Sequence, residues 1–138
     1  MIVDTSAFIA IALAEPEREI FHDLIRDSWV RKMSVASYLE CAEVYFRKLD
    51  LDNGIALLDA DIAELGITIV AVTAQQAFVA AEARRTYGKG RHRANLNYGD
   101  CFTYALAKVM EEPLLFKGDD FTHTDIRSAL RRLARKLP

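Results

Sequence analysis

The chain opens with a short apolar stretch that runs directly into a carboxylate. Residues 1–3 are apolar and precede Asp4, and Thr5 and Ser6 separate Asp4 from an apolar helical pattern over 7–13. This pattern predicts a buried strand that ends at Asp4, with Thr5 or Ser6 capping the following helix. The carboxyl ends of strands form the ligand crevice in open α/β sheets, so Asp4 is placed where chemistry is usually done. The alternative is that Asp4 is only a helix cap.

A chain of 138 residues predicts a single domain over 1–138. The apolar fraction of 51% is typical of a folded globular protein. The longest apolar run, 7–14, is far short of the roughly 20 residues that a membrane helix needs. No basic segment precedes it, which argues against a secretory signal. Cys41 and Cys101 show neither disulfide nor zinc-ligand spacing, so we expect two buried thiols in a cytoplasmic protein.

The charge of the chain is unevenly distributed. A net charge of −2 and a pI near 5.9 are not typical of a nucleic-acid-binding protein. One basic cluster nevertheless falls within ten positions, and it consists of Arg84, Arg85, Lys89, Arg91, His92 and Arg93. A second lies at the end of the chain and consists of Arg127, Arg131, Arg132, Arg135 and Lys136.

Apolar periodicity predicts short strands alternating with helices. The predicted strands lie at 1–3, over the segment bracketed by 29–30 and 33–35, at 67–72 and at 114–116. The predicted helices cover 7–13, the segment after Pro16, 37–49 capped by Ser37, 52–66 capped by Asp52, 73–87 capped by Thr73, the segment opening at Asp100, and the segment after Thr124 with Leu133 and Leu137 inside. Such alternation indicates parallel strands joined by right-handed crossovers. We therefore predict a three-layer α/β fold with a parallel sheet of about four strands flanked by helices.

The predicted elements bring five acids to one end of this sheet. Asp4 ends the first strand, Glu40 lies one turn into a helix, Asp100 opens another, and Asp119 and Asp120 follow the last strand. Clustered carboxylates repel one another unless cations are present. Hard oxygen ligands suit Mg²⁺ or Mn²⁺, which activate water and neutralise charge on a phosphate.

Each acid also has a local explanation. Glu40 could be a solvated helix residue, Asp100 a first-turn acid, and Asp119 and Asp120 ordinary turn residues. The convergence of all of them at one end of the sheet is what indicates a site.

The basic cluster within 84–93 has two interpretations: its side chains contact RNA phosphates, or they only keep a loop solvated. We favour the contact with RNA phosphates. The sequence Gly88-Lys89-Gly90 lacks the spacing of a nucleotide-binding phosphate loop. The helical stripe formed by Arg127, Arg131 and Arg135 is interpreted as an exposed face.

Four blocks of sequence resemble those of the PIN-domain ribonucleases, and within them the VapC-type toxins of toxin–antitoxin pairs. The blocks are residues 1–6, the Leu39-Glu40 pair, 97–101 continued by 104–107, and 115–121. They span nearly the whole chain in the order and spacing of that family. The family is therefore a specific match rather than a fold-level analogy.

The resemblance implies a Mg²⁺- or Mn²⁺-dependent endoribonuclease that cleaves structured RNA such as tRNA or rRNA. It also implies a homodimer and a cognate VapB-like antitoxin that inserts a segment into the active-site groove. Asp4, Glu40 and Asp100 match the family's best-defined acids and its metal site, and both Asp119 and Asp120 fit the looser fourth position. Thr5 or Ser6 matches a small hydroxyl position that supports the first acid. Tyr38 and Tyr45, expected to be exposed on their helix, also favour dimerisation.

Two other functions remain to be weighed. A phosphatase of the haloacid-dehalogenase type needs a second acid two residues after the first, and here that residue is Ser6. A catalytically inactive PIN-fold module that only binds RNA is the main alternative, because a fold alone does not fix function. Metal-dependent cleavage separates this alternative from the enzyme.

Overall fold

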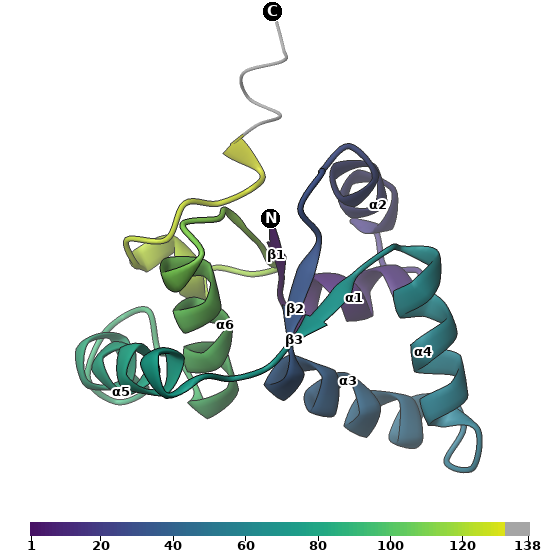
Figure 1. Cartoon of the computed structure of the whole chain (residues 1–138), viewed down its shortest axis with the longest axis horizontal. Helices are drawn as coiled ribbons and strands as arrows, with labels where there is room; N and C mark the ends of the chain where they lie inside the picture. The colour runs from purple at the N-terminus through teal and green to yellow at the C-terminus, as the bar shows by residue number, and fades with distance from the viewer. Residues whose placement is uncertain (132–138) are drawn as a thin grey trace, which may run out of the picture.

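Four parallel strands form the centre of the computed structural model, which describes residues 1–131 (Figure 1). The strand order is β3-β2-β1-β4, so the chain opens in the middle of the sheet. The strands are β1 (Ile2–Val3), β2 (Lys32–Ser34), β3 (Thr68–Val70) and β4 (Leu114–Leu115). In this register Ile2 pairs with both Lys32 and Leu114. The predicted parallel four-stranded sheet is confirmed.

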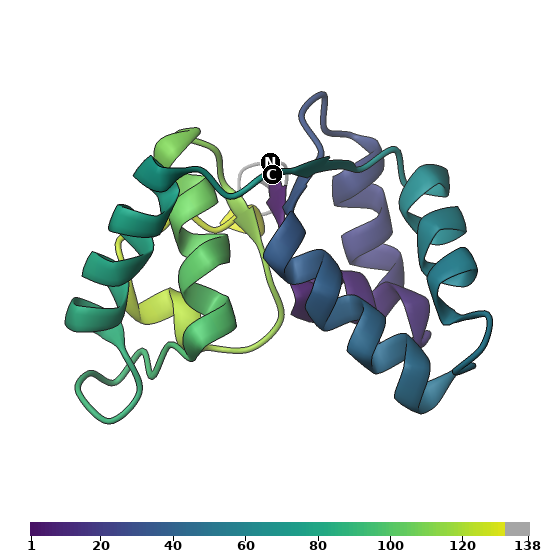
Figure 2. The same ribbon diagram turned by 60° about the horizontal axis from the view of Figure 1, so that its bottom comes forward.

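Helices cover both faces of the sheet, as Figure 2 shows. One layer contains α1 (Thr5–Ala12), α2 (Arg18–Arg26), α3 (Val35–Lys48) and α4 (Gly54–Glu64). The other contains α5 (Ala74–Tyr87), α6 (Tyr98–Val109) and the short 3-10 helix η1 (Asp120–His123). The predicted three-layer α/β architecture is therefore correct. Within the described residues, no helix is long and apolar enough to cross a membrane.

The alternating side chains of the short strands divide the core into two clusters. Val3 and Leu115 face the layer of α1 to α4, whereas Ile2 and Leu114 face the layer of α5 and α6. All four side chains have no exposed surface. Successive residues of a strand point to opposite faces, and burying each such side chain stabilises the fold by about 1.5–3 kcal/mol. Two adjacent apolar residues are thus enough to anchor a helical layer on each side.

Three predicted helix caps are displaced by one to three residues. Ser34, not Ser37, caps α3, because its side-chain oxygen accepts a hydrogen bond from the backbone N–H of Ala36 at 3.2 Å. Asp4, not Thr5 or Ser6, caps α1. Asn53, not Asp52, precedes α4. The cap predicted at Thr73 is confirmed, because its hydroxyl oxygen accepts a hydrogen bond from the N–H of Gln76 at 3.1 Å. At α1 and α3 a polar residue close to the predicted one accepts the hydrogen bond from the first turn. The side chain of Asn53 makes no such bond at α4.

The predicted helix after Thr124 is wrong over residues 124–130. Residues 124–130 run beside β4, where the N–H of Leu114 donates to the carbonyl oxygen of Arg127 at 2.9 Å and the N–H of Ala129 donates to that of Leu114 at 2.8 Å. The edge of β4 would otherwise leave backbone groups unpaired, so pairing prevails over the apolar helical spacing. The predicted stripe is therefore not helical at Arg127. Residues 132–138, with Leu133, Arg135 and Leu137, lie outside the described residues.

Candidate active site

Asp4 follows β1 and combines the two roles weighed for it. It is the N-cap of α1, and its carboxylate oxygen Oδ2 accepts hydrogen bonds from the backbone N–H of Ser6 at 2.9 Å and from Ser6 Oγ at 2.6 Å. Ser6 Oγ in turn accepts a hydrogen bond from the backbone N–H of Lys117 at 3.0 Å. The side chain is 5% exposed. Asp4 is therefore a cap whose carboxylate is also fixed at the carboxyl end of the sheet.

Glu40 reaches the same place from the second turn of α3. Its Oε2 accepts a hydrogen bond from Thr5 Oγ1 at 2.7 Å, which ties α3 to the start of α1. Burial raises the pKa of Glu40, and the negative charge of Asp4 adds to this effect, whereas the hydrogen bond from Thr5 opposes it. Glu40 is therefore not a solvated helix residue. It is a half-buried acid with a neutral donor and a like charge beside it.

Asp100 lies in the first turn of α6 and forms a reciprocal cap with Asn97. Its Oδ2 accepts a hydrogen bond from the N–H of Asn97 at 2.8 Å, and Asn97 Oδ1 accepts one from the N–H of Asp100 at 2.9 Å. Burial raises the pKa of Asp100 to about 6, and the charges of Asp4, Asp120 and Glu40 contribute to this rise. The bond from Asn97 acts in the opposite direction. Four acids from distant parts of the chain therefore share one electrostatic environment.

The structure distinguishes the two acids that follow β4. Asp120 is the first residue of η1, and its charge helps to raise the pKa of Asp100. Asp119 precedes η1, and its backbone carbonyl oxygen accepts a hydrogen bond from the N–H of Thr122 at 2.9 Å. Both side chains are exposed. Asp120 is thus the member of the pair that joins the acid cluster, whereas Asp119 closes the turn before η1.

The chemistry of these acids fits a hard divalent cation. Among residues 1–131, no salt bridge neutralises Asp4, Glu40, Asp100 or Asp120. In that same part of the chain no three acids, histidines or cysteines are arranged as a ready-made metal cage. Mg²⁺ commonly binds one or two carboxylates and keeps several waters, so it does not require such a cage. Burial raises the pKa values of Glu40 and Asp100, neighbouring negative charge adds to both, and a bound cation would oppose these effects.

The cysteines beside two of these acids are not nucleophiles. Cys41 and Cys101 are free and buried, as predicted. Burial raises the pKa of both thiols, and the charge of Asp4 adds to the rise for Cys41. A thiol must lose its proton to attack or to bind a metal, so neither cysteine supplies the chemistry of this site.

Comparison with known proteins identifies the family. The sequence model of the PIN domain matches residues 1–127. The VapC ribonuclease Mb0640 of Mycobacterium bovis is 51% identical over 126 residues, which cover 91% of this chain and 95% of that protein. The chain belongs to the PIN domain family, and within it to the VapC ribonucleases.

Solved structures with the same fold include VapC20 of Mycobacterium tuberculosis, described as a toxin that cleaves the sarcin–ricin loop. The two structures match with a TM-score of 0.73 at 15% sequence identity, and the match covers 91% of this chain and 95% of the VapC20 chain. The VapBC-1 structure from nontypeable Haemophilus influenzae has a TM-score of 0.71 at 17% identity, covering 92% and 94% of the two chains. At such low identity the likeness establishes the PIN fold alone.

The basic cluster of this PIN domain divides into structural and solvent-facing members. Arg84 donates a hydrogen bond to the carbonyl oxygen of Leu96 and holds the loop before α6. Arg85 pairs with Glu82 at 2.7 Å. His92 Nδ1 accepts a hydrogen bond from a backbone N–H, and its ring packs edge-on against an aromatic neighbour. Lys89, Arg91 and Arg93 are exposed and, within residues 1–131, form neither a salt bridge nor a side-chain hydrogen bond such as that of Arg84.

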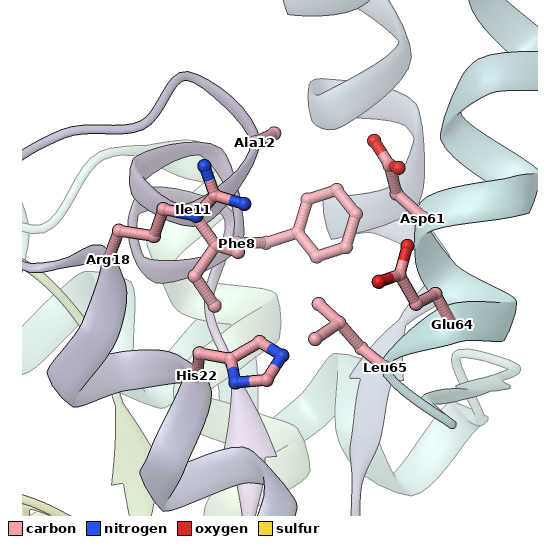
Figure 3. A pocket seen from close by; sticks show the side chains of 8 residues that line it. All are labelled: Phe8, Ile11, Ala12, Arg18, His22, Asp61, Glu64 and Leu65. Carbon is pink, nitrogen blue, oxygen red and sulfur yellow. The ribbon is translucent and has the colours of Figure 1, made fainter.

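A separate cavity of about 120 Å³ lies between α1, α2 and α4 of the PIN domain (Figure 3). Phe8 and Leu65 form part of its apolar wall, and charged or titratable side chains come from Arg18, His22, Asp61 and Glu64. None of the acids of the candidate site lines it.

Tyr45 and Tyr38, expected to be exposed on α3, instead join α3 to α4. Tyr45 has no exposed surface and donates a hydrogen bond to Asp61. Tyr38 donates one to Asp59 at 2.9 Å. The expectation that both tyrosines form an exposed aromatic surface is therefore wrong. The large apolar side chains that α3 does expose include Val35 and Leu39.

Several residues of the site were not singled out as functional from the sequence. Asn97 was recognised as part of a family block but not as the cap that orients Asp100, although an Asn three residues before an acid is a capping signature. The contact between Ser6 and Lys117 joins residues 111 positions apart, and no local pattern predicts it. Gly99 also belongs to the site, because it lies directly against the carboxylate of Glu40.

Proposed function

We propose that this VapC-family chain is a metal-dependent endoribonuclease that hydrolyses RNA phosphodiester bonds as the toxin of a toxin–antitoxin pair. The observation that carries the proposal is the convergence of acids from distant elements: Glu40 lies against Gly99 beside Asp100, and burial and the charges of Asp4, Asp120 and Glu40 raise the pKa of Asp100. Buried acids without cations are costly to a fold, so their retention favours a catalytic role. Ribonuclease relatives with about half of their residues identical to this chain support the same activity.

The bound cation is proposed to be Mg²⁺ or Mn²⁺, held chiefly by Asp4 and Asp100 with Glu40 and Asp120 completing the site. When bound, such an ion activates water and stabilises the charge that develops on a phosphate. The chain itself supplies orientation through Ser6, which fixes the carboxylate of Asp4. The other acids are oriented by neutral donors, Thr5 for Glu40 and Asn97 for Asp100. Neutral donors fix an acid without cancelling its charge, which leaves the charge for the cation.

RNA would approach over the loop that precedes α6. Lys89, Arg91 and Arg93 are exposed, and this loop leads directly into the helix that carries Asp100. Phosphate contacts of this kind position a substrate without selecting its sequence. Structured RNA such as tRNA or rRNA is the proposed substrate class, in a cytoplasmic setting.

A cognate VapB-like antitoxin is the proposed partner, with a segment that covers the acid site and blocks RNA. The VapBC-1 relative and a toxin–antitoxin complex from Klebsiella pneumoniae share the fold of this chain. A homodimer is also proposed, and its candidate surface is now the exposed apolar side chains of α3, Val35 and Leu39, rather than the tyrosines. Light scattering of the purified chain and of a Leu39→Lys variant tests this interface.

The decisive experiment incubates purified protein, confirmed free of antitoxin, with total RNA in Mg²⁺, in Mn²⁺ and in EDTA, alongside Asp4→Asn. Discrete fragments that require metal and disappear in the variant establish the nuclease. RNA that is bound but intact under every condition would instead establish the inactive RNA-binding module. A folded Asp4→Asn protein with wild-type cleavage would refute the proposed site.

A further inference from the structure

Helices α3 and α6 approach one another closely beside the acid site. Figure 2 shows the first turns of α3 as the part of that helix nearest to α6. Ser37 Oγ of α3 and Thr103 Oγ1 of α6 lie 3.0 Å apart in a buried hydrogen bond. One turn from this contact, Glu40 of α3 lies against Gly99 of α6. The spacing of the two helices is therefore set by small side chains.

No side chain larger than hydrogen fits at position 99 while Glu40 keeps its place. A Cβ atom built on Gly99 would lie 1.7 Å from Glu40 Oε1, 2.6 Å from its Cδ and 3.0 Å from its Oε2. Carbon and oxygen atoms that are not bonded pack at about 3.5 Å, so the carboxylate occupies the volume of the missing Cβ.

The backbone conformation at position 99 does not require a glycine. Gly99 lies in the first turn of α6, and its backbone is helical rather than left-handed. Glycine within a helix is less stable than alanine by about 1 kcal/mol, so an alanine would suit the helix better. The residue is explained instead by the acid that packs on it.

We propose that Gly99 is a positioning residue that admits the Glu40 carboxylate to its place between Thr5 and the start of α6. The inference rests on the proposed nuclease function and deepens it. A side chain at position 99 would push Glu40 away and break its hydrogen bond to Thr5, which is 2.7 Å long in the native chain. Because the displaced atoms are the end of a flexible side chain, the fold survives and only the site is changed.

The test is Gly99→Ala, with Ser37→Ala as the matched control. Ser37→Ala disturbs the same pair of helices without touching the Glu40 carboxylate. For Gly99→Ala we expect an unchanged or higher melting temperature, a kcat lowered by at least about tenfold, which is 1.4 kcal/mol of transition-state stabilisation, and a KM within about twofold of wild type. A crystal structure of the variant should lack the hydrogen bond between Thr5 and Glu40. Ser37→Ala should retain both the kcat and that bond.

A second variant separates a displaced carboxylate from a general disturbance. Glu40→Asp shortens the side chain by one methylene and withdraws the carboxylate from position 99. We expect Glu40→Asp alone to lower kcat, and Gly99→Ala to lower it much less in that background than in wild type. Such non-additivity is expected only when the two residues act through one contact. Fully additive losses would overturn the proposal.

The outcomes distinguish failure of this inference from failure of the proposed function. If wild type cleaves RNA and Gly99→Ala cleaves equally well, or keeps the bond between Thr5 and Glu40, positioning by Gly99 is refuted while the nuclease stands. A loss of kcat shared equally by Ser37→Ala would attribute the effect to helix packing and also refute it. If wild type does not cleave, the nuclease proposal fails, and the structure of Gly99→Ala still decides whether Gly99 positions Glu40.

Discussion

Two acids lie at opposite ends of helix α6 in contrasting environments: Asp100 belongs to its first turn, and Asp125, from the segment after η1, packs against its later turns. At the first turn, Asp100 has a neutral backbone donor and three like charges, and burial with those charges raises its pKa to about 6. Against the later turns, Asp125 accepts hydrogen bonds from Tyr104 at 2.7 Å and from Lys108 at 2.8 Å. Burial alone would raise the pKa of Asp125, but the bonds from Lys108 and Tyr104 outweigh it and lower that pKa.

The difference shows how a structural acid can be told from a functional one in this chain. Asp125 has its cation within the protein, so its charge stabilises the packing of residues 124–130 on α6. Asp100 is left with charge that nothing in residues 1–131 neutralises by a salt bridge. Removing the charge of Asp125 should therefore lower the stability of the protein, whereas removing the charge of Asp100 should lower its activity.

The largest expected effect is the loss of cleavage in Asp100→Asn and Asp4→Asn. Asparagine keeps a side-chain oxygen for the cap but removes the charge that holds a cation. Such an ion stabilises a transition state by several kcal/mol, so kcat/KM should fall by about 10³-fold or more. The measurement is metal-dependent cleavage of an RNA fragment, with melting curves as the control for folding. Substantial cleavage by either folded variant would mean that Asp100 is no more functional than Asp125.

A smaller effect is expected from the loop that leads into the first turn of α6. Combined replacement of Lys89, Arg91 and Arg93 by alanine should raise KM for RNA by about tenfold at moderate salt and leave kcat nearly unchanged. The slope of log KM against log salt concentration should also become shallower by about one for each lost phosphate contact. Arg85→Ala is the matched control, because Arg85 is paired with Glu82. Equal effects of the two variants would show that the loop makes no particular phosphate contacts.

The stability of the metal-free protein should depend on pH through Asp100. Its pKa is raised from 3.8 to about 6, so the folded state binds this proton more tightly than the unfolded chain. The associated stability is fully present below about pH 4 and is lost as pH rises through 6. After allowance for solvent screening, wild type should lose about 1–2 kcal/mol relative to Asp100→Asn between pH 4.5 and 7.5. Denaturant unfolding in EDTA measures this difference, and parallel pH curves for the two proteins would contradict it.

The smallest expected effect comes from the other end of the helix. Asp125→Asn removes an ion pair whose two side chains are 42% and 51% exposed and weakens the hydrogen bond from Tyr104. The free energy of unfolding at pH 7 should fall by about 1 kcal/mol, with cleavage unchanged. Because the pKa of Asp125 is lowered, its contribution is present above pH 4 and is lost as pH falls through that lowered pKa. If Asp125→Asn lost cleavage without losing stability, Asp125 would be a functional acid rather than a structural one.

The sequence was sufficient for the fold wherever apolar spacing and local polar signals agreed. The apolar residues before Asp4 and the β-branched run at 67–72 predicted strands, and the chain does form strands there. The segment after Thr124 was mispredicted because its apolar spacing suits a helix, whereas the unpaired edge of β4 is a tertiary feature that no local window contains. Cap residues were displaced where two polar residues lay within one turn of each other, as with Ser34 and Ser37.

The sequence predicted which acids form the candidate site, but not which neighbouring residues hold their side chains in place. Strand ends and helix starts placed Asp4, Glu40 and Asp100 at one edge of the sheet, and their mutual influence on pKa agrees with that placement. The choice between Asp119 and Asp120 depends on the turn into η1, which the sequence does not specify. Positive charge at the basic cluster was overestimated because Arg85 pairs with Glu82 three residues earlier on α5, a local pairing that the sequence interpretation left out.

The division of the core into two clusters has a consequence for the acids. Asp4 and Glu40 belong to elements of the α1-to-α4 layer, whereas Asp100 and Asp120 belong to the layer of α5 and α6. The separation between the two pairs is therefore a separation between two packed layers, which are joined through strands of only two or three residues and through the contact of α3 with α6. A cation bound by both pairs would hold the layers at one spacing. Its affinity would then include the free energy of that restraint, and hydrogen exchange should slow in both layers when it binds.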